Sequence, residues 1–414
     1  MSTKAKLSAT ERALSILEED DFFGKIRDAV ERCGLVGEER NAVAIYVIVI
    51  SSLLDRPLNV IIKGVSSAGK NWLATRVLKL VPKEAVREIT SSSKAAWNYS
   101  RDDFRNRIVY LPERNEAAGA VHPVRLLISE GKLIRTVTVR EGGKLKAEEF
   151  VAEGPIASIS TTTRDRIEID DENRHVSVWI DESPEQTRRI TFRKLSPLPQ
   201  LDEDEIAVWY EVYKLIQKRA SVPVKFPDWL IQIADKVPTD VRVRRYFPAF
   251  LEALRTVALI HSFWIHAEDY EPGEVITAQF RDYAIAAFIF NDVFVESLDR
   301  GDDECVATSK AVEAIASTQD EKPVDADQLA KFLNISYDKA SARLRAALEA
   351  GMIVRANESE RNNNKRYIAS KVRRFVPDPA EVVELVEINK PITLSHPVSG
   401  EEIKLPSKRR SSKA

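Results

Sequence analysis

The sequence contains only two cysteines in 414 residues, Cys33 and Cys305, and they are far apart. No histidine stands near either of them in the sequence. A disulfide framework and cysteine-based zinc sites are therefore excluded as organising features of the fold, and this cysteine usage fits a reducing compartment.

Long apolar runs and a dominant sign of charge are also missing. The most apolar stretch, residues 42–54, is too short to span a bilayer, and the N-terminus has no signal-peptide pattern. We therefore expect a cytoplasmic protein that makes no membrane contact. Because 62 Lys and Arg nearly balance 64 Asp and Glu, any surface that binds nucleic acid must be a local patch.

Glycine is scarce as well, with 14 residues, yet Gly64 and Gly69 stand in the spacing G-x-x-x-x-G-K. A β-branched run at 60–62 precedes this loop, and an apolar helical pattern at 73–80 follows it. This context is typical of a phosphate-binding loop, whose N–H groups and lysine hold a polyphosphate. The alternative is a glycine turn between a core strand and a core helix. The predicted binding residues are Gly64, Val65, Ser66, Ser67, Ala68, Gly69, Lys70 and Asn71.

The expected cofactors are ATP and Mg²⁺. The residue after the lysine is usually Ser or Thr, whose hydroxyl ligates Mg²⁺, but here it is Asn71, whose amide oxygen is the predicted metal ligand. Glu113 follows a strand at 107–111 and is predicted to activate the attacking water, unless it is only a surface residue after a buried strand. Pro112 stands where a magnesium-supporting Asp is usual.

The predicted fold class is α/β, a doubly wound parallel sheet. Further strands are expected at 85–89, 156–160 and 176–180, alternating with helices, and the ligand is expected beyond their carboxyl ends. Helices are also expected at 22–33 and 38–54, and the segment before residue 20 is expected to be helix-prone and partly disordered.

A β-hairpin is expected from two alternating runs at 133–140 and 144–152, which flank Gly142 and Gly143. Such a basic hairpin either follows a phosphate backbone or is a solvated edge ribbon protected by its charge. The candidate DNA contacts on the hairpin and its approach are Lys132, Arg135, Arg140, Lys144 and Lys146.

The order of these parts resembles the AAA+ module of minichromosome maintenance (MCM) replicative helicases, especially their relatives on phages and mobile elements. The resemblance covers roughly residues 35–298, without the N-terminal collar domain of those helicases. It implies that one of the threonines at 161–163 replaces the sensor asparagine, and we select Thr162. It further implies that Arg174 is an arginine finger presented to a neighbouring subunit.

The resemblance also implies a helical lid, for which long helices are expected at 203–220, 241–267 and 277–297. An arginine at the start of the second of these helices would sense the γ-phosphate. We select Arg244, with Arg242 and Arg245 as rivals, and the alternative is a basic helix start anchored to carboxylates.

A winged helix is expected near the C-terminus, from helices at 310–317, 325–333 and 336–350 and strands at 352–355 and 365–368. Such modules bind duplex DNA or dock proteins. The candidate DNA contacts are Lys339, Arg343, Arg345, Lys365 and Arg366. The expected domains are a helical segment (1–34), an AAA+ core (35–200), a helical lid (201–298), a linker (299–308), the winged helix (309–372), and an extension with a basic tail (373–414).

These features predict an ATP-dependent homo-oligomeric ring, with a hexamer as one arrangement, that holds single-stranded DNA in its channel. It would act as a helicase or translocase in DNA replication of a mobile or phage-like element. Because Asn71, Pro112 and the sensor threonine depart from the usual pattern, two alternatives stay open. One is an ATP-binding assembly factor with little or no hydrolysis, and the other is a winged-helix regulator.

Overall fold

The computed structural model of the chain describes residues 7–91, 97, 103–141, 144–164, 167–237, 243–266, 270–299, 303–319, 322–349, 353–356, 365–369, 374–386 and 391–406. The chain forms two compact units. The first comprises Met1–Ala234, Arg245–Phe290 and Asp378–Ala414, and the second comprises Asp235–Arg244 and Asn291–Pro377. The expected lid is thus divided between the two units, and the C-terminal extension belongs to the first unit from Asp378 onward.

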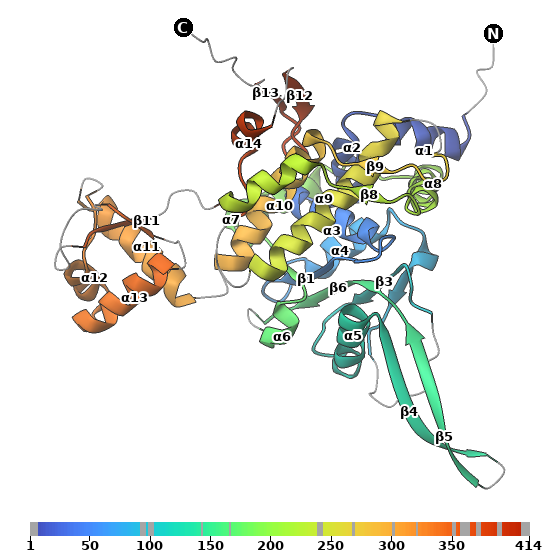
Figure 1. Ribbon diagram of the computed structural model, residues 1–414, viewed down its shortest axis with the longest axis horizontal. Helices are drawn as coiled ribbons and strands as arrows, with labels where there is room; N and C mark the ends of the chain where they lie inside the picture. Colours follow the sequence, from blue (N-terminus) through green and yellow to red (C-terminus); the bar gives the residue numbers. More distant parts are fainter. Residues whose placement is uncertain are drawn as a thin grey trace. The chain divides into compact units, whose positions relative to one another are not determined.

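The first unit is built on a parallel sheet of five strands in the order β2-β3-β6-β1-β7 (Figure 1). These strands are β1 (Asn59–Lys63), β2 (Val86–Glu88), β3 (Arg107–Leu111), β6 (Ile156–Thr162) and β7 (Val176–Trp179). Every residue of β1, β6 and β7 is buried, as is typical of parallel strands covered on both faces. The predicted parallel sheet and its strands are confirmed.

Helices cover both faces of this sheet. The predicted helices at the start of the sheet form as α2 (Phe22–Arg32) and α3 (Glu39–Ser51), and α3 packs against α4 (Lys70–Leu78) and β1. α5 (Ala118–Glu130) shares a buried cluster with Val109 and Leu111 of β3 but not with the residue between them, so it covers one face only. Tyr110 points to the other face of β3 and is also buried, so that face is covered as well.

The carboxyl ends of three neighbouring strands meet at one edge of the sheet. Lys63 at the end of β1 pairs with Thr162 at the end of β6, and Leu111 at the end of β3 pairs with Ser160. The loop after β1, Glu113 and the threonines after residue 160 are thereby brought to the same place, as the parallel sheet predicts.

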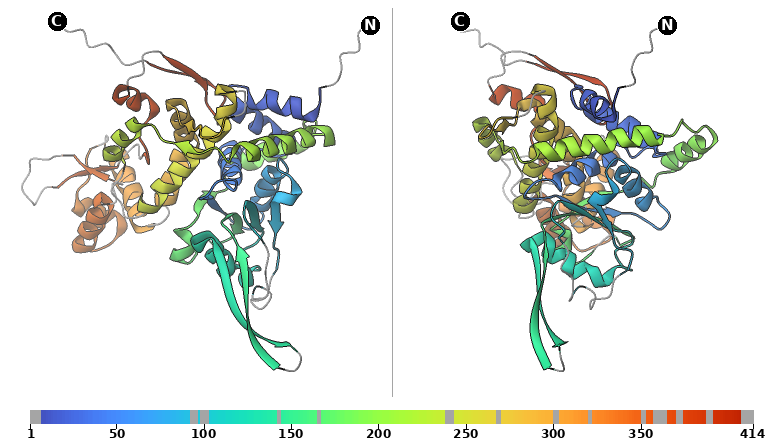
Figure 2. Two further views of the ribbon diagram at one scale, coloured as in Figure 1. Left: turned by 45° about the vertical axis from the view of Figure 1, so that its right-hand side comes forward. Right: turned by 90° about the vertical axis from the view of Figure 1, so that its right-hand side faces the viewer.

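The predicted hairpin is present, with β4 (Lys132–Glu141) paired antiparallel to β5 (Lys144–Glu153). It starts directly after Gly131, which caps α5 in a left-handed conformation. Only its base is packed, because Leu133 and Ala152 belong to the same cluster as α5. The rest of the two strands extends away from the sheet (Figure 2).

The remaining elements of the first unit are mostly helical. They are α1 (Ala9–Leu17), a 3₁₀ turn at Lys83–Ala85, α6 (Ile169–Glu172), α7 (Pro184–Leu195), α8 (Glu203–Arg219), β8 (Val224–Lys225), β9 (Ile276–Thr277), α14 (Pro379–Leu385), β12 (Ile392–Ser395) and β13 (Glu402–Leu405). Residues 9–17 of the helix-prone segment expected before residue 20 form α1. A capping box of Ser8 and Glu11 begins this helix, and α1 packs on α8.

Three further helical elements include residues of both units: the 3₁₀ helix Asp228–Lys236, α9 (Val243–Ile265) and α10 (Phe280–Asp299). Across the described ranges, no helix is both long and apolar enough to cross a membrane.

The second unit contains the three C-terminal helices and two strands that the sequence predicts. They are α11 (Asp303–Ser317), α12 (Ala326–Leu333), α13 (Tyr337–Glu349), β10 (Ile353–Arg355) and β11 (Tyr367–Ala369). The core of this unit includes Val312, Leu329, Leu344, Ile353 and Tyr367. The expected linker at 299–308 is largely helical, since α10 ends at Asp299 and α11 begins at Asp303.

Candidate nucleotide site and basic surfaces

The phosphate loop lies between β1 and α4, at the carboxyl edge of the sheet. Gly69 has a φ of 101°, a left-handed conformation that glycine takes without strain. The Lys70 ammonium donates to the carbonyl oxygens of Gly64 (2.9 Å) and Val65 (2.7 Å). Burial lowers the pKa of Lys70, opposed by the charges of Glu113 and Glu182. A lysine held over a loop that opens a helix is placed to meet a phosphate.

Asn71, Glu113 and Thr161 form a chain of hydrogen bonds beside this lysine. The Thr161 hydroxyl donates to Asn71 Oδ1 (2.7 Å) and accepts from the Glu113 backbone N–H (2.9 Å). Glu113 has a φ of 57°, which is uncommon for a residue other than glycine. Together with Lys70 these residues line one cavity of about 470 Å³. The structure thus brings together residues that the sequence placed at the ends of separate strands.

Thr161, and not the selected Thr162, is the threonine whose hydroxyl reaches the phosphate loop. Successive residues of a strand point to opposite faces, so the two hydroxyls cannot both bind Asn71. Thr162 Oγ1 instead accepts a hydrogen bond from the Arg164 N–H (3.1 Å), although Thr162 also lines the cavity. The hydrogen bonds thus favour Thr161 over the selected Thr162 as the threonine that contacts the loop.

The oxygen donors at this cavity suit a magnesium ion that is held mainly by phosphate and water. Asn71 and Glu113 provide amide and carboxylate oxygens, which Mg²⁺ prefers. Pro112 has no side-chain donor at the position where an Asp is usual. Among the residues that the structure describes, no group of three or more His, Cys, Asp or Glu could hold a metal ion by itself.

A second acidic side chain contacts the phosphate loop, and the sequence analysis missed it. Glu182 lies just beyond β7, and its Oε1 accepts a hydrogen bond from the Val65 N–H (2.7 Å). A Cβ atom on Gly64 would lie 3.0 Å from the same oxygen. The Val65 amide of the loop is therefore paired with a carboxylate, an anionic oxygen acceptor as a phosphate oxygen is.

A larger cavity of about 510 Å³ adjoins the phosphate loop and was also missed. Such a volume is suitable for a nucleoside. Its apolar walls include Leu35, Val36, Ile180 and Ile190, and the loop itself contributes Ser67, Ala68 and Gly69. Gln186, Ile190 and Arg193 line it from α7 at spacings of four and three residues, so they share one face of that helix.

A buried carboxyl group lines the same cavity. Glu38 is 7% exposed, and its two oxygens accept hydrogen bonds from the Asp181 N–H (2.9 Å) and Asn41 Nδ2 (2.6 Å). Burial raises the pKa of Glu38 to about 7, although both hydrogen bonds act to lower it. This carboxyl group therefore titrates near neutral pH.

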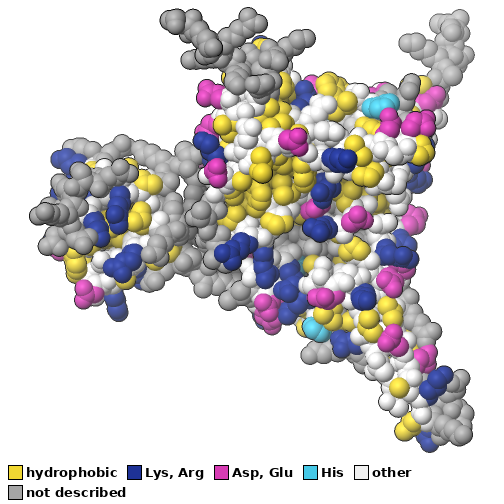
Figure 3. All heavy atoms as spheres, viewed as in Figure 1, with side chains coloured by type: hydrophobic (Ala, Val, Ile, Leu, Met, Phe, Trp, Pro, Cys, Tyr) yellow, Lys and Arg dark blue, Asp and Glu magenta, His cyan; other side chains and the backbone are white. Residues whose placement is uncertain are grey.

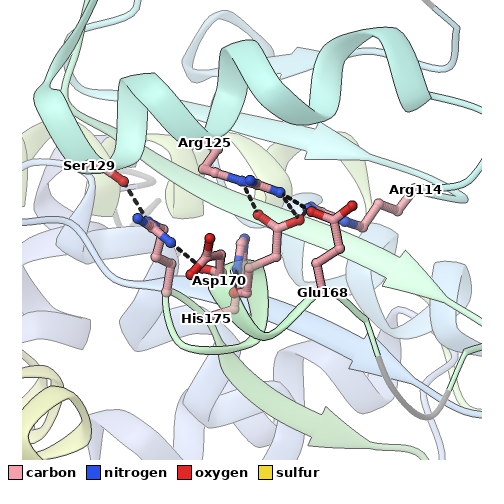
Figure 4. Close-up of polar contacts among 8 residues, drawn as sticks. Arg114, Arg125, Ser129, Glu168, Asp170 and His175 are labelled. Carbon is pink, nitrogen blue, oxygen red and sulfur yellow. Dashed lines mark hydrogen bonds and ion pairs between the residues drawn. The ribbon is translucent and has the colours of Figure 1, made fainter.

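An ionic cluster around the buried Arg114 directly follows Glu113 in the chain, and Figure 4 shows Arg114 together with Arg125 and Glu168. Asp171 binds two guanidinium groups, those of Arg114 (2.5 Å) and Arg125 (2.5 Å), and Arg125 also pairs with Glu168 (2.6 Å). Burial acts to raise the pKa of Asp171, but the hydrogen bonds from Arg125 and the charge of Arg114 outweigh it and lower that pKa. Because Arg114 directly follows Glu113, the cluster fixes the chain next to the candidate catalytic glutamate.

Arg174, the predicted arginine finger, lies at the opposite edge of the sheet from the phosphate loop of its own subunit. It precedes the parallel strand β7, whereas Lys70 follows the carboxyl end of β1. Its guanidinium donates to Ser129 Oγ (2.6 Å), and to the backbone carbonyl of Asp170. Ser129 is on α5, three residues before the hairpin begins at Lys132. Arg174 therefore connects the start of β7 to the base of the hairpin.

The selected lid arginine, Arg244, is exposed and belongs to the second unit. Its rival Arg245 belongs to the first unit, where it lines a cavity of about 180 Å³ together with Arg56 and Arg174. Arg242 lies outside the described residues. The structure thus brings Arg245, and not Arg244, into a cavity with the predicted finger.

The basic residues of the hairpin do not share one face. The strand register places Lys132 and Arg140 on one face and Arg135 and Lys146 on the other. Toward the tip, basic and apolar side chains lie side by side (Figure 3), and Leu145 is 75% exposed. The side chain of Lys144 lies outside the described set.

In the second unit, Lys339 and Arg345 are exposed and Arg343 is partly buried along α13. Lys365 and Arg366 come directly before β11. The tip between the two strands, residues 357–364, lies outside the described part of the chain.

A parallel sheet with a strand, a phosphate loop and a helix, and a lysine over that loop, defines a P-loop NTPase. The chain belongs to the family of the MTBMA_p00010 P-loop domain, whose model matches residues 6–218.

The solved structures that are similar to this chain include the following three. An MCM homolog from Methanopyrus kandleri is 11% identical with a TM-score of 0.45, and the match covers 72% of this chain and 63% of that chain. NtrX from Brucella abortus, in complex with ADP, is 13% identical with a TM-score of 0.25, covering 78% and 72%. The apo NrS-1 C-terminal region is 14% identical with a TM-score of 0.24, covering 50% and 45%. At these values the likenesses assign no function to this chain, and no curated protein matches it.

Proposed function

We propose that this chain is an AAA+ ATPase of the MCM type that hydrolyses ATP with Mg²⁺ and uses the energy to act on DNA as a helicase or translocase. The observation that carries the proposal is the convergence of Lys70, Asn71, Thr161 and Glu113 on one cavity. The adjoining cavity beside the same loop offers room for the nucleoside. The proposed biological role is the replication of a mobile or phage-like element. This part of the proposal rests on the order of sequence motifs alone.

Each residue of the phosphate site has a definite task in this scheme. Lys70 exchanges its carbonyl partners on the loop for phosphate oxygens, and the loop N–H groups hold the remaining phosphate charge. Glu113 accepts a proton from the attacking water. Thr161 holds both the Glu113 backbone and the Asn71 amide in place through its hydroxyl. The bound Mg²⁺ neutralises charge on the phosphates.

The DNA would be engaged by the hairpin in the channel of a homo-oligomeric ring. Contacts of its lysines and arginines with sugar-phosphate suit movement along any sequence. Arg174 would act on the nucleotide of the neighbouring subunit, in agreement with its distance from the phosphate loop of its own chain. Its bond to Ser129 would link that nucleotide to the base of the hairpin. The C-terminal unit is proposed as a winged helix that contacts duplex DNA through α13 and the wing.

A second candidate function is an ATP-gated DNA-binding or assembly factor that hydrolyses little or no ATP. Two features favour this candidate, because each leaves fewer protein oxygen atoms to ligate Mg²⁺. Pro112 has no side-chain oxygen, and Asn71 Oδ1 already accepts a hydrogen bond from Thr161. A DNA-binding regulator with a nucleotide-sensing domain would likewise need no turnover.

Steady-state ATP hydrolysis with Mg²⁺ separates these functions. Turnover by the wild type that falls by about a hundredfold or more in Lys70→Ala and in Glu113→Gln is the expected result. Nucleotide binding should survive in Glu113→Gln, since that carboxylate acts on water. Tight binding of ATP by the wild type without turnover would favour the second candidate.

A further inference from the structure

A half-exposed aromatic ring lies between the two cavities at the phosphate loop. Trp72 follows Lys70 by two residues on α4, and its exposed fraction is 49%. Ser67, Gly69 and Trp72 line both the cavity that contains Lys70 and Glu113 and the larger apolar cavity that adjoins it. A ligand that extends from one cavity into the other would therefore pass beside the indole ring.

The orientation of this ring is fixed on two sides. The indole Nε1–H donates to the backbone carbonyl of Gly34 (3.0 Å). A Cβ atom on Gly34 would lie 3.5 Å from Cζ2, on the same edge of the ring. The Arg76 guanidinium lies over one face, 3.5 Å from the ring centroid, in a favourable cation–π contact. Gly34 thus covers one edge of the ring and Arg76 covers one face.

The second face of the ring is open. Because one face and one edge are already covered, the exposed part of the Trp72 side chain includes the other face, and within the described part of the chain no aromatic ring stacks on it. Leu35, Val36, Ile180 and Ile190 provide aliphatic walls in the same cavity. An aromatic face with aliphatic surface around it is suited to a flat apolar group.

We infer that the open face of Trp72 stacks on the base of the bound nucleotide. This inference rests on the proposed nucleotide site and adds the residue that holds the base. A nucleotide joins a polyphosphate to a planar base, and the structure places a phosphate loop next to an apolar cavity with Trp72 on the boundary. Every base has a π-face, so stacking contributes affinity for the base without selecting one sequence of ring substituents.

The test compares ADP with ribose 5-diphosphate, which lacks only the base. Neither ligand has a γ-phosphate to be hydrolysed. Dissociation constants are measured with Mg²⁺ by titration calorimetry. The wild type should bind ADP roughly tenfold or more tightly than ribose 5-diphosphate, the range expected of one stacked base. In Trp72→Ala this preference should fall by roughly fivefold or more, whereas the affinity for ribose 5-diphosphate should stay within about twofold of the wild type.

Two further variants separate stacking from a structural role. Trp72→Phe keeps an aromatic face and should retain most of the preference for ADP. ADP, but not ribose 5-diphosphate, should quench the tryptophan emission of the wild type, and this quenching should be lost in Trp72→Phe. Trp264→Ala is the matched control, because Trp264 is 42% exposed with the Arg281 guanidinium 4.9 Å from its ring centroid, yet it does not line either cavity. It should keep the wild-type preference.

Equal binding of ADP and ribose 5-diphosphate by the wild type would overturn the inference, even if Trp72→Ala does not fold. An equal loss of affinity for both ligands in Trp72→Ala would also overturn it, because Trp72 would then only support the phosphate loop. Binding that depends on Lys70 but not on Trp72 refutes only the stacking role. Binding that is absent, or unaffected by Lys70→Ala, refutes the proposed nucleotide site itself.

Discussion

Thr161 determines how the residues of the phosphate site are arranged. Its hydroxyl is bonded to Asn71 and to the Glu113 backbone, and the side chain is fully buried. Thr161→Val keeps the shape but leaves both partners unsatisfied, which costs about 1–3 kcal/mol. We expect ATP turnover to fall roughly tenfold or more, as measured by steady-state kinetics.

Thr162→Val provides the control for this change. It removes a hydroxyl from the same strand end, but that hydroxyl accepts only from the Arg164 N–H among the bonds described. Turnover should stay within about threefold of the wild type. Equal losses in the two variants would show that Thr161 has no special position.

The pKa of Glu38 predicts how stability depends on pH. Burial raises this pKa in the folded state to about 7, from the ordinary value of 4.5 for a glutamate. The contribution of Glu38 to stability is therefore fully present below pH 4.5 and is lost as pH rises toward 7, by at most about 1.4 kcal/mol per pH unit. Urea unfolding of the wild type and Glu38→Gln across this range should show the difference.

The stability of the wild type alone would not isolate Glu38, because His175 also makes stability depend on pH. Burial lowers its pKa to about 4, so its contribution is lost as pH falls from 6.5, with the opposite slope. The two effects partly cancel in the wild type. Subtracting the Glu38→Gln profile isolates Glu38, and parallel profiles would contradict the raised pKa.

At the residue scale, the sequence predicted the loop and Glu113 because each belongs to a local pattern of strand, loop or strand end. It could not choose Thr161, because three threonines in a row carry no signal until the strand register is known. Gln186, Glu38 and Glu182 were missed for another reason. They reach the site from separate segments, and each looks like an ordinary polar residue in the sequence.

The hairpin is the element whose charges bear on DNA. Arg140 and Lys146 lie toward its tip on opposite faces and are both exposed. Replacing both by Ala should weaken binding of single-stranded DNA and make it less dependent on salt. The slope of log K against log salt should decrease by about 1.4, since each phosphate contact contributes roughly 0.7.

The double variant Lys83→Ala, Arg87→Ala is the control, because it removes the same number of positive charges. Both residues are exposed, at the start of β2 and away from the hairpin in sequence. This variant should keep the wild-type salt slope. If both double variants lower the slope equally, the hairpin is a solvated ribbon and not a DNA contact.

At the element scale, strong local patterns carried the predictions of the sheet, the hairpin and the C-terminal helices. Among the elements that the sequence analysis missed is α7, which lines the nucleoside-sized cavity. Its sequence is charged, and it leaves Phe192 (73%) and Leu195 (82%) exposed, so it has no clear apolar stripe. Ser183 as the cap and Pro184 at the first helical position were the available signals.

At the scale of the whole molecule, the central expectation is that Arg174 acts across subunits. Lys70→Ala and Arg174→Ala should each reduce ATP turnover strongly, with a loss for an arginine finger of roughly a thousandfold. Mixing the two inactive proteins should restore part of the activity, because some interfaces combine an intact loop with an intact Arg174.

A mixture that is no more active than its components would contradict this arrangement. Arg174 would then serve only to hold the start of β7 against Ser129. A mixture of Lys70→Ala with Glu113→Gln is the control. It should stay inactive, since both residues act within one phosphate site.

Division of the chain into units was the least predictable feature. The sequence placed domain boundaries at 200, 298 and 308, from the family resemblance and from an acidic, polar stretch. The second unit instead comprises Asp235–Arg244 and Asn291–Pro377, and the first includes Asp378–Ala414. Such long-range packing depends on contacts between distant segments, for example the hydrogen bond from Arg281 to the Thr393 carbonyl (3.0 Å). Patterns of neighbouring residues in the sequence do not predict such packing.

The most direct test of the account is the rate of ATP hydrolysis by the wild type as single-stranded DNA is added. The account predicts turnover that rises with DNA to a plateau and is absent in Lys70→Ala. Tight ATP binding without turnover, or turnover that DNA leaves unchanged, would contradict the claim that ATP hydrolysis in this chain is coupled to DNA.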